Sequence, residues 1–487
     1  MRILMVASEM APFARTGGLG DVLGALPRAL AALGQDVRVV MPRYGFIDEN
    51  SFPLRPLDLS IEIPVNTGTR PLTVELYRDH RSRLETYFID NEDYFDRREL
   101  YHDPRTGQDY TDNDERFLFL SRGALEIARH LDWKPDVVHV HDWQAGLAPV
   151  YLKTVYSEDS FFQGSVSVLT IHNLAYQGTF DPSRFRKLNL PEHLMHPTAP
   201  FEFYGKVNFL KAAIMFADRI TTVSPRYATE IQSSEELGCG LQDVLKQRRQ
   251  VLSGILNGVD YTVWSPSRDK LIPYRYHINN LSGKRMNKVE LLNTAKLPVR
   301  ANAPLIGIIG RLVDQKGFDL IAAAADRIFA MDVQVIILGT GDERHHQALR
   351  ELEVEYPDKL KVYLKFDDAL AHRIEAGADI YLMPSRFEPC GLNQMYSLKY
   401  GTMPVVREVG GLADTVVDYN PETGEGTGFV FREYTPEALL DALQRAIALF
   451  SKRRKWTKLM KAGMKQDFSW QCSARKYVEL FESLRAA

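Results

Sequence analysis

The segment Ile306–Ile321, IGIIGRLVDQKGFDLI, contains the repeating unit from which the fold follows. An apolar, β-branched run ends at Gly310, a short loop follows, and a helix-like run begins after the loop. This order is typical of a buried strand, a loop at its carboxyl end and a covering helix. The loop also carries two cations, Arg311 and Lys316, which are five positions apart.

The same alternation continues along most of the chain. Continuous apolar strands separated by helices predict parallel sheets that are covered on both faces. The sequence therefore predicts an α/β fold with two doubly wound parallel sheets. The expected strands lie at 2–8, 36–42, 136–141 and 166–173 in the first half, and at 305–311, 333–341, 360–366 and 379–385 in the second.

One helix is predicted clearly by its spacing. Leucines and Val22 between Leu19 and Leu33 recur at i, i+3, i+4 and i+7, which indicates an amphipathic helix. Pro27 lies inside this pattern, so we expect a kink there.

Composition limits the class of protein. A chain of 487 residues exceeds one ordinary core, and length alone predicts roughly two to four domains. The net charge is -3, from 60 basic and 63 acidic residues, which indicates neither a nucleic-acid partner nor a membrane surface. No apolar run approaches the roughly 20 residues needed to span a bilayer. The three cysteines are far apart, which argues against disulfides and CxxC metal sites and favours a reducing, cytoplasmic location.

The domain boundaries follow from a change in composition. A polar, aromatic passage at 257–303 separates the two halves. We expect an N-terminal Rossmann-like domain at 1–256, a C-terminal one at 257–469, and a helix at 470–487 that packs back on the first domain.

A short internal repeat suggests an anion site. GGLGD occurs at 17–21 and GGLAD at 410–414, each after a strand-like run and before a helix-like one. Glycines allow close backbone approach, and the free N–H groups of a helix N-terminus attract anions. Chance or helix capping is the alternative. Two sheets facing each other would place such loops around one cleft.

Several polar side chains end predicted strands. His139, His141 and Asp142 end one strand and His172 another. Metal ligation is one reading, but no third His or Cys lies at ligand spacing, so we favour polar groups projecting into a cleft. A buried, hydrogen-bonded histidine is the alternative. The triplet Asp112–Asp114 resembles a metal–diphosphate motif, but a turn or helix N-cap is favoured.

Several common catalytic motifs do not occur. The sequence has no GxSxG nucleophile elbow, no GxxxxGK[ST] phosphate loop and no GxGxxG after the first strand. Arg311 and Lys316 suit a diphosphate, with a solvated surface pair as the alternative. Glu388 lies at the end of the run ADIYLMP, before Pro389, Cys390 and Gly391. These features favour transfer from an anionic, diphosphate-activated donor.

Seven motifs in order carry a family resemblance: RTGGLGDVLGALPRAL, HVHDWQAGL, TIHNLAYQG, LNGVD, GRLVDQKGFDLI, PSRFEPCGLNQ and GGLADTV. From residue 3 to about residue 482 the chain closely resembles the bacterial glycogen synthase and plant starch synthase family. The resemblance implies the GT-B fold, with two Rossmann-like domains facing a deep interdomain cleft. It also implies glucose transfer from ADP-glucose to the non-reducing 4-hydroxyl of an α-1,4-glucan, such as glycogen, with retention. It implies no metal and no other cofactor.

The resemblance also implies roles for individual residues. Arg311 and Lys316 match the pair that neutralises the departing ADP, and Glu388 matches the glutamate of the glucose pocket. His172 and Asp142 match groups that hold the glucose. The remaining positions match substrate-binding residues: Arg15, Gly17, Gly18 and Asp21 in the first glycine motif, Tyr94 and Asn257 at the cleft, Phe366 against the adenine, and Cys390, Gly391, Leu392 and Asn393 in the turn after the glutamate.

The chain departs from the family pattern at three positions. Arg15 replaces a lysine, Asn393 replaces a threonine, and Phe366 replaces the tyrosine of close relatives. Stacking needs the ring rather than the hydroxyl, so adenine recognition should survive at Phe366. Tyr396 stands where many other retaining enzymes of this fold have a second glutamate, as it does in the synthase family.

Two other functions stay open at this point. One is a related retaining transferase that uses UDP-glucose or makes maltose 1-phosphate. The other is a non-catalytic glucan- or nucleotide-binding protein, against which the presence of Arg311, Lys316, His172 and Glu388 argues. Cys390 is interpreted as a small residue that supports the turn rather than as a nucleophile.

Overall fold

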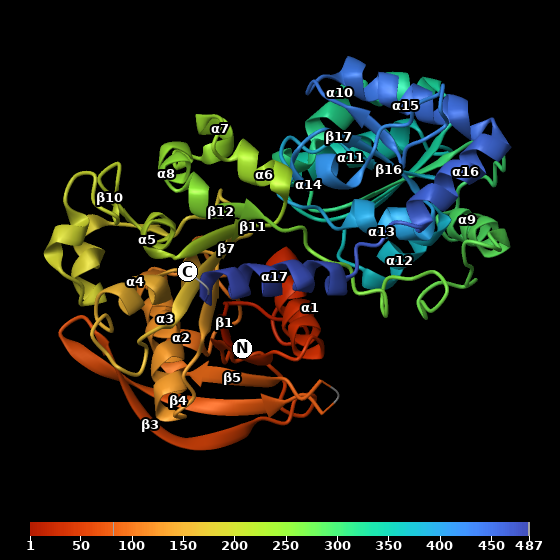
Figure 1. The fold of residues 1–487 in the computed structure, drawn as a ribbon. Coiled ribbons are helices and arrows are strands. Elements are labelled where there is room, and N and C mark those ends of the chain that lie inside the picture. The colour runs from red at the N-terminus through yellow and green to blue at the C-terminus, as the bar shows by residue number, and fades with distance from the viewer. Residues whose placement is uncertain (81, 486–487) are drawn as a thin grey trace. The chain divides into compact units, whose positions relative to one another are not determined.

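The computed structural model describes residues 1–80 and 82–485, and it divides into two compact units (Figure 1). Unit 1 comprises 1–223, 228–258 and the chain from Trp470 onward, and unit 2 comprises 224–227 and 259–469. The C-terminal helix α17 (Trp470–Arg485) belongs to unit 1, where it packs against α1 (Gly18–Ala32). The last two residues of the predicted segment 470–487 lie outside the described residues.

Unit 1 is built on a nine-stranded sheet in the order β12-β11-β7-β6-β1-β2-β5-β4-β3. The strands from β12 to β5 are parallel, as predicted, and β4 and β3 are antiparallel. A small antiparallel sheet has the order β8-β10-β9. The strands are β1 (Arg2–Val6), β2 (Asp36–Pro42), β3 (Arg55–Val65), β4 (Gly68–Arg78), β5 (Glu85–Asp90), β6 (Val137–His141), β7 (Val166–Ile171), β8 (Thr179–Phe180), β9 (Glu202–Phe203), β10 (Lys206–Asn208), β11 (Arg219–Thr222) and β12 (Leu252–Gly254).

The β3–β4 hairpin at the sheet edge was not predicted. In β3, buried Ile61, Ile63 and Val65 alternate with side chains that are more exposed. Alternation of this kind is typical of an antiparallel strand with one face in water. The predicted parallel sheet is thus extended by an antiparallel edge, for which the sequence did hold a signal.

The helices of unit 1 include α1, in which Pro27 is buried. The others are α2 (Glu92–Phe95), α3 (Asn113–His130), η1 (Trp143–Ala145), α4 (Leu147–Lys153), η2 (Pro182–Leu188), η3 (Glu192–Met195), α5 (Phe209–Phe216), α7 (Glu235–Gly238), α8 (Gln242–Gln247), η4 (Arg249–Val251) and α17; α6 (Pro225–Glu230) has residues in both units.

Unit 2 is built on a six-stranded sheet, order β15-β14-β13-β16-β17-β18, in which every pair is parallel. All eight strands that the sequence predicted are present in the two sheets. The elements are β13 (Leu305–Ile309), β14 (Gln334–Leu338), β15 (Leu360–Tyr363), β16 (Ile380–Met383), β17 (Met403–Arg407), β18 (Phe429–Phe431), α9 (Ser282–Thr294), η5 (Asp314–Lys316), α10 (Phe318–Ala330), α11 (Glu343–Glu355), α12 (Asp368–Gly377), α13 (Asn393–Tyr400), α14 (Gly410–Thr415), α15 (Pro436–Phe450) and α16 (Arg453–Met464).

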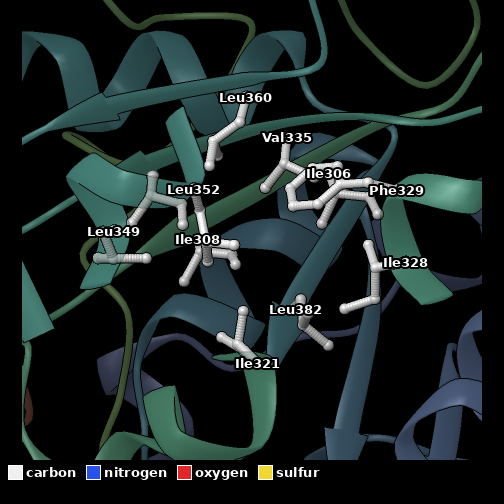
Figure 2. Close-up of a pocket in the computed structure, with 11 residues that line it drawn as sticks. Ile306, Ile308, Ile321, Ile328, Phe329, Val335, Leu349, Leu352, Leu360 and Leu382 are labelled. Carbon is white, nitrogen blue, oxygen red and sulfur yellow. The ribbon is translucent and has the colours of Figure 1, made fainter. Parts of the chain in front are cut away.

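The core of unit 2 contains a cavity of about 10 Å³ (Figure 2). Its walls are aliphatic and aromatic, with Ile306 and Ile308 of β13, Leu382 of β16 and Phe329 of α10 among them. A void of roughly this size holds at most one water, and a water needs polar partners that these walls do not offer. The cavity is a packing defect of the core rather than a ligand site.

Within the described ranges 1–80 and 82–485, we find no helix that is both long and apolar enough to span a bilayer.

Candidate active site

The carboxyl ends of β13 and β16 bring a lysine and a glutamate together. The two strands pair in the sheet, so the loops that follow them meet at one edge. Lys316 Nζ lies 2.6 Å from Glu388 Oε2, although the two residues are 72 positions apart. The Ser385 hydroxyl donates to the same oxygen at 3.0 Å. Glu388 is only 5 % exposed, so its charge is compensated by the lysine in a mostly dry setting.

A glycine allows this approach. Gly317 follows Lys316 with φ +77°, and a Cβ added there would lie 2.1 Å from the carbonyl oxygen of Pro384. No other residue type fits without moving one of the two loops. Arg311 is exposed in the same loop, before η5.

The second glycine motif packs against the turn that carries Glu388. A Cβ on Gly410 would lie 1.9 Å from the Glu388 carbonyl oxygen, and one on Gly411 would lie 2.0 Å from that of Cys390. Gly410 also has φ +43°. These glycines are therefore required by packing, and they fix the backbone of the glutamate turn.

The first glycine motif has different surroundings. A Cβ on Gly17 or Gly18 would have no atom within 4 Å. Gly17 is the N-cap of α1, a 15-residue helix, and no side chain caps its N–H groups. Open space beside free helix N–H groups is what an anion needs. The two copies of the repeat thus have different roles. Of the two, only the first has space for a ligand within its own unit.

The loop before α1 is held by a residue that the sequence analysis did not select. Glu9 is 3 % exposed, and its carboxylate accepts the backbone N–H of Thr16 at 2.6 Å and the Thr16 hydroxyl at 2.7 Å. The preceding residue, Arg15, pairs with Asp21 at 3.0 Å. A carboxylate at the carboxyl end of the first strand was the available signal for Glu9.

The histidines at the ends of β6 and β7 form a buried group. His141 Nδ1 and His172 Nε2 are 3.0 Å apart, and His139 Nε2 bonds the Thr170 hydroxyl at 2.7 Å. Burial lowers the pKa of His172 to about 3, so the ring is neutral at physiological pH. His139 is buried, with Nε2 bonded to Thr170 and Nδ1 without a partner among the described residues, so the alternative of a satisfied buried histidine holds for one of its ring nitrogens. His172 is 9 % exposed and lies nearer the surface of the unit.

Asp142 has a strained backbone, with φ 56° and ψ −171°. Non-glycine residues occupy this region at a cost and mostly at functional sites. Its Oδ1 accepts the backbone N–H of His172 at 2.7 Å, which joins the two predicted glucose-binding residues. Burial raises the pKa of Asp142 to about 7; the backbone N–H bond from His172 opposes the rise, and the charge of Glu9 adds to it.

The raised pKa predicts a pH-dependent activity. If ionised Asp142 grips the sugar, kcat/KM should rise as the pH is raised from about 5.5 to about 7.5, because the carboxyl loses its proton in this range. His172 stays neutral over this range and does not contribute to the rise in kcat/KM. The Asp142→Asn variant should be slow, and its pH profile should lack this rising limb. A limb of unchanged midpoint in that variant would assign the titration to another group.

The other predicted binding residues differ in their exposure and in whether their polar atoms already have a partner. Phe366, beyond β15, is 78 % exposed, which suits stacking against a base. Asn257 is 6 % exposed, and its buried Oδ1 has no partner among the described residues. Tyr94 is 4 % exposed, its hydroxyl donates to Glu115 at 2.9 Å, and its ring packs on Phe119. Its predicted place at a cleft stays a prediction.

The triplet 112–114 lies at the start of α3, as predicted. Asp112 occupies the N-cap position, but its carboxylate binds Arg97 instead of the helix N–H groups.

Comparison with known proteins identifies the family. The model of the starch synthase catalytic domain matches residues 2–247, and that of glycosyl transferases group 1 matches residues 292–462. A glycogen synthase of Anaeromyxobacter sp. is 48 % identical over 487 residues, covering all of both chains. The chain belongs to the glycogen and starch synthase family.

Other members support the assignment. The glycogen synthase of Thermotoga maritima is 44 % identical and covers 100 % of this chain and 99 % of its own. The catalytic domain of starch synthase IV from Arabidopsis thaliana, solved with ADP and acarbose, superposes with a TM-score of 0.91 at 32 % identity, covering 100 % and 99 % of the two chains. The chain is a glycosyltransferase with the GT-B fold of this family.

In the turn after Glu388, the side chain of Asn393 is bound within the fold. Gly391 has φ +70°, and Leu392 is the N-cap of α13. The Asn393 amide donates to the Tyr381 hydroxyl at 2.6 Å and to the Ile309 carbonyl at 3.2 Å. The asparagine thus ties α13 to the end of β13. Its side chain is engaged within the fold.

Tyr396 makes a stacking contact that a glutamate at this position could not make. Its ring stacks on Trp264 with centroids 4.0 Å apart and planes 3° apart. Trp264 in turn stacks on His372, which bonds Asp269 at 2.7 Å. An aromatic at this position is therefore explained by packing.

Cys390 is expected to be replaceable. It is 4 % exposed, and its carbonyl accepts the Gln394 amide at 3.0 Å while Gly411 packs against its backbone. Serine has nearly the same size, so Cys390→Ser should keep kcat within about fivefold of the parent, in line with a tolerated near-isosteric change. Complete loss of glucosyl transfer in a variant that melts normally would instead make the thiol a participant.

Proposed function

We propose that this enzyme transfers glucose from ADP-glucose to the non-reducing 4-hydroxyl of an α-1,4-glucan, with retention of anomeric configuration. The observation that carries the proposal is the contact of Lys316 with buried Glu388 at the ends of two adjacent strands. It supports the proposal because a lysine, which suits a leaving phosphate, lies beside a carboxylate, which suits sugar hydroxyls. The Arabidopsis relative was solved with ADP and acarbose, which supports a nucleotide and a sugar as ligands of this chain.

Arg311 and Lys316 stabilise the leaving group. As the bond from the anomeric carbon to the diphosphate breaks, negative charge grows on ADP. Fixed cations at that position stabilise the transition state more than the ground state. Because Arg311 is exposed, its fork is free to turn toward a phosphate.

The residues proposed to bind the glucose are Glu388 in unit 2 and Asp142 and His172 in unit 1. Ionised carboxylates accept hydrogen bonds from hydroxyl groups, and a neutral imidazole both donates and accepts hydrogen bonds. In unit 1, the bond from the His172 N–H to Asp142 sets the mutual position of the two residues. In unit 2, Lys316 and Ser385 set the orientation of Glu388.

We propose that the anomeric configuration is retained because the acceptor hydroxyl attacks the same face of the sugar that ADP leaves. Glu388 Oε2 is already bound by Lys316 and Ser385, which makes that oxygen a poor nucleophile. We therefore favour an oxocarbenium-like ion pair, in which a phosphate oxygen of the leaving ADP takes the proton of the acceptor hydroxyl. Trapping a glucosyl adduct on a side chain would disprove this route.

The donor is tested by transfer of radiolabelled glucose to glycogen. We expect incorporation from ADP-glucose, with UDP-glucose at least about tenfold poorer in kcat/KM, as expected when one base contact is lost. Incorporation from UDP-glucose alone would favour the related transferase instead. Product linkage is read by digestion with an α-1,4-specific hydrolase. No incorporation from either donor would support a binding protein.

Two further points belong to the same proposal. The transfer is proposed to need no metal, because Arg311 and Lys316 supply the positive charge; excess EDTA should leave kcat unchanged. The proposed location is the cytoplasm, where the wide separation of Cys239, Cys390 and Cys472 suits a reducing environment.

A further inference from the structure

A hydrogen bond between two histidines of unit 1 restricts how one of them can meet a ligand. His141 Nδ1 and His172 Nε2 are 3.0 Å apart, at the carboxyl ends of the paired strands β6 and β7. The Nε2 atom of His172 is therefore occupied within the fold. Its Nδ1 atom has no partner among the described residues and is not closed off from the surface, so it is the ring nitrogen that a ligand can reach.

Burial keeps both rings uncharged. His141 is 0 % exposed, and burial lowers its pKa well below the usual value, with the charges of His139 and His172 adding to the effect. Burial also lowers the pKa of His172 to about 3. A neutral imidazole carries one N–H, so one ring of the pair donates and the other accepts. The pair therefore has two possible arrangements, which differ in where each ring holds its proton.

The second nitrogen of His141 distinguishes between the two arrangements. This atom, Nε2, is buried and has no hydrogen-bond partner among the described residues. If His172 donated to His141, the proton of His141 would lie on Nε2, as a buried N–H without an acceptor. Buried N–H groups without an acceptor are rarer in native proteins than acceptors without a donor. Donation from His141 Nδ1 leaves only a lone pair at Nε2, so it is the less costly arrangement.

His139 lies beside His141 on β6 and provides an internal comparison. Its ring centroid is 4.2 Å from that of His141, and the rings of Tyr477 and Phe481 in α17 lie 5.4 and 5.5 Å from it. His139 Nε2 bonds the Thr170 hydroxyl, while Nδ1 is buried without a partner among the described residues. By the same reasoning, the proton of His139 lies on Nε2. His139 and His141 therefore hold opposite tautomers.

We infer that His141 fixes His172 in the tautomer with its proton on Nδ1, so that His172 is a hydrogen-bond donor to its ligand. The inference rests on the proposed function for the identity of this ligand, the glucose. Ionised Asp142 can only accept hydrogen bonds from sugar hydroxyls, and His172 supplies a donor to a sugar oxygen. His141 is a positioning residue, because it acts on the sugar only through His172.

The test is nitrogen NMR of the full-length protein with isotope-labelled histidine, first without a ligand. We expect a protonated Nδ1 and an unprotonated Nε2 at His172. A scalar coupling across the hydrogen bond should join the Nδ1–H of His141 to Nε2 of His172. His139 should show the opposite pattern, with its proton on Nε2. Substitution of each of the three histidines in turn assigns the signals.

Addition of ADP-glucose tests the contact with the ligand separately. The Nδ1–H of His172 should exchange more slowly with water, because a sugar oxygen accepts it, while the coupling to His141 remains. ADP alone should not slow this exchange. Binding of ADP-glucose without the slower exchange would overturn the donor role. Absence of ADP-glucose binding would instead contradict the proposed function, and the tautomer measured in the free protein would still decide the inference.

Matched variants test whether the bond matters for glucosyl transfer. His141→Phe keeps an aromatic ring but removes the donor, so it should lower kcat/KM for ADP-glucose about tenfold, the value of one hydrogen bond. His139→Phe makes the same change on the same strand and should cost less than about threefold, because His139 makes no bond to His172. His141→Asn supplies an amide N–H near the position of Nδ1 and should recover most of the loss.

Two further results would overturn the inference. A proton on Nε2 of His172, with Nδ1 unprotonated, would mean that His172 donates to His141 and only accepts from its ligand. Equal losses in His141→Phe and His139→Phe, without recovery in His141→Asn, would mean that both rings contribute packing alone. Equal melting temperatures show that the variants fold. Because the tautomer is read in the parent protein, a variant that does not fold leaves the decisive measurement in place.

Discussion

Replacement of Lys316 by alanine is expected to lower kcat with ADP-glucose by about 10²- to 10³-fold, the usual cost of removing one transition-state charge contact. The lysine is the cation nearest Glu388, at 2.6 Å, and it stands in the loop that also holds Arg311. Its charge matters most when the bond to ADP breaks. The KM for ADP-glucose should change less than kcat.

The controls separate charge loss from damage to the fold. Without Lys316, the mostly buried Glu388 has no compensating cation, so a lower melting temperature is also expected. Lys361→Ala provides a matched control, because Lys361 pairs with Glu353 at 2.6 Å in the same unit but away from these loops. Steady-state rates measured well below both melting temperatures decide the matter. A near-normal kcat with only a raised KM would contradict the proposed role.

Replacement of Glu388 by alanine is expected to cripple turnover by a similar factor, about 10²- to 10³-fold, while ADP still binds. The carboxylate is proposed to contact the sugar, so its loss should leave the nucleotide contacts in place. Removing it also frees Lys316 from its ion pair, so ADP affinity should stay equal or rise. Calorimetry with ADP and transfer assays with ADP-glucose measure the two effects separately.

A graded series tests the same residue. Glu388→Gln keeps the shape and removes the charge, and it should be nearly as slow as the alanine variant. Ser385→Ala removes only the hydroxyl that donates to Oε2, so it should cost about tenfold, the value of one charge-assisted hydrogen bond. Parallel loss of ADP binding and of turnover in Glu388→Ala would show instead that the residue supports the whole loop.

The sheets were predictable where the signal was local. Eight apolar runs became β1, β2, β6, β7, β13, β14, β15 and β16, because continuous β-branched runs between helices specify buried parallel strands. The hairpin of β3 and β4 was missed because its alternating pattern differs from that of the other strands.

The candidate site was predictable in residue type more than in contacts. Arg311, Lys316 and Glu388 were selected as polar residues at strand ends. Glu9 was passed over, because its role depends on the return of the chain to Thr16. The two glycine motifs read alike in sequence, yet Gly410 and Gly411 pack against the glutamate turn while Gly17 and Gly18 face open space.

The sequence by itself determined the alternation of strands and helices and the kind of side chain at each strand end, because periodicity and turn chemistry act over a few residues. Only the tertiary structure decided that Lys316 forms an ion pair with Glu388, 72 positions away. It also decided that position 317 must be a glycine, because its backbone packs against the carbonyl oxygen of Pro384. Those contacts depend on β13 lying beside β16 in the sheet, and the order of strands is set by packing among distant segments.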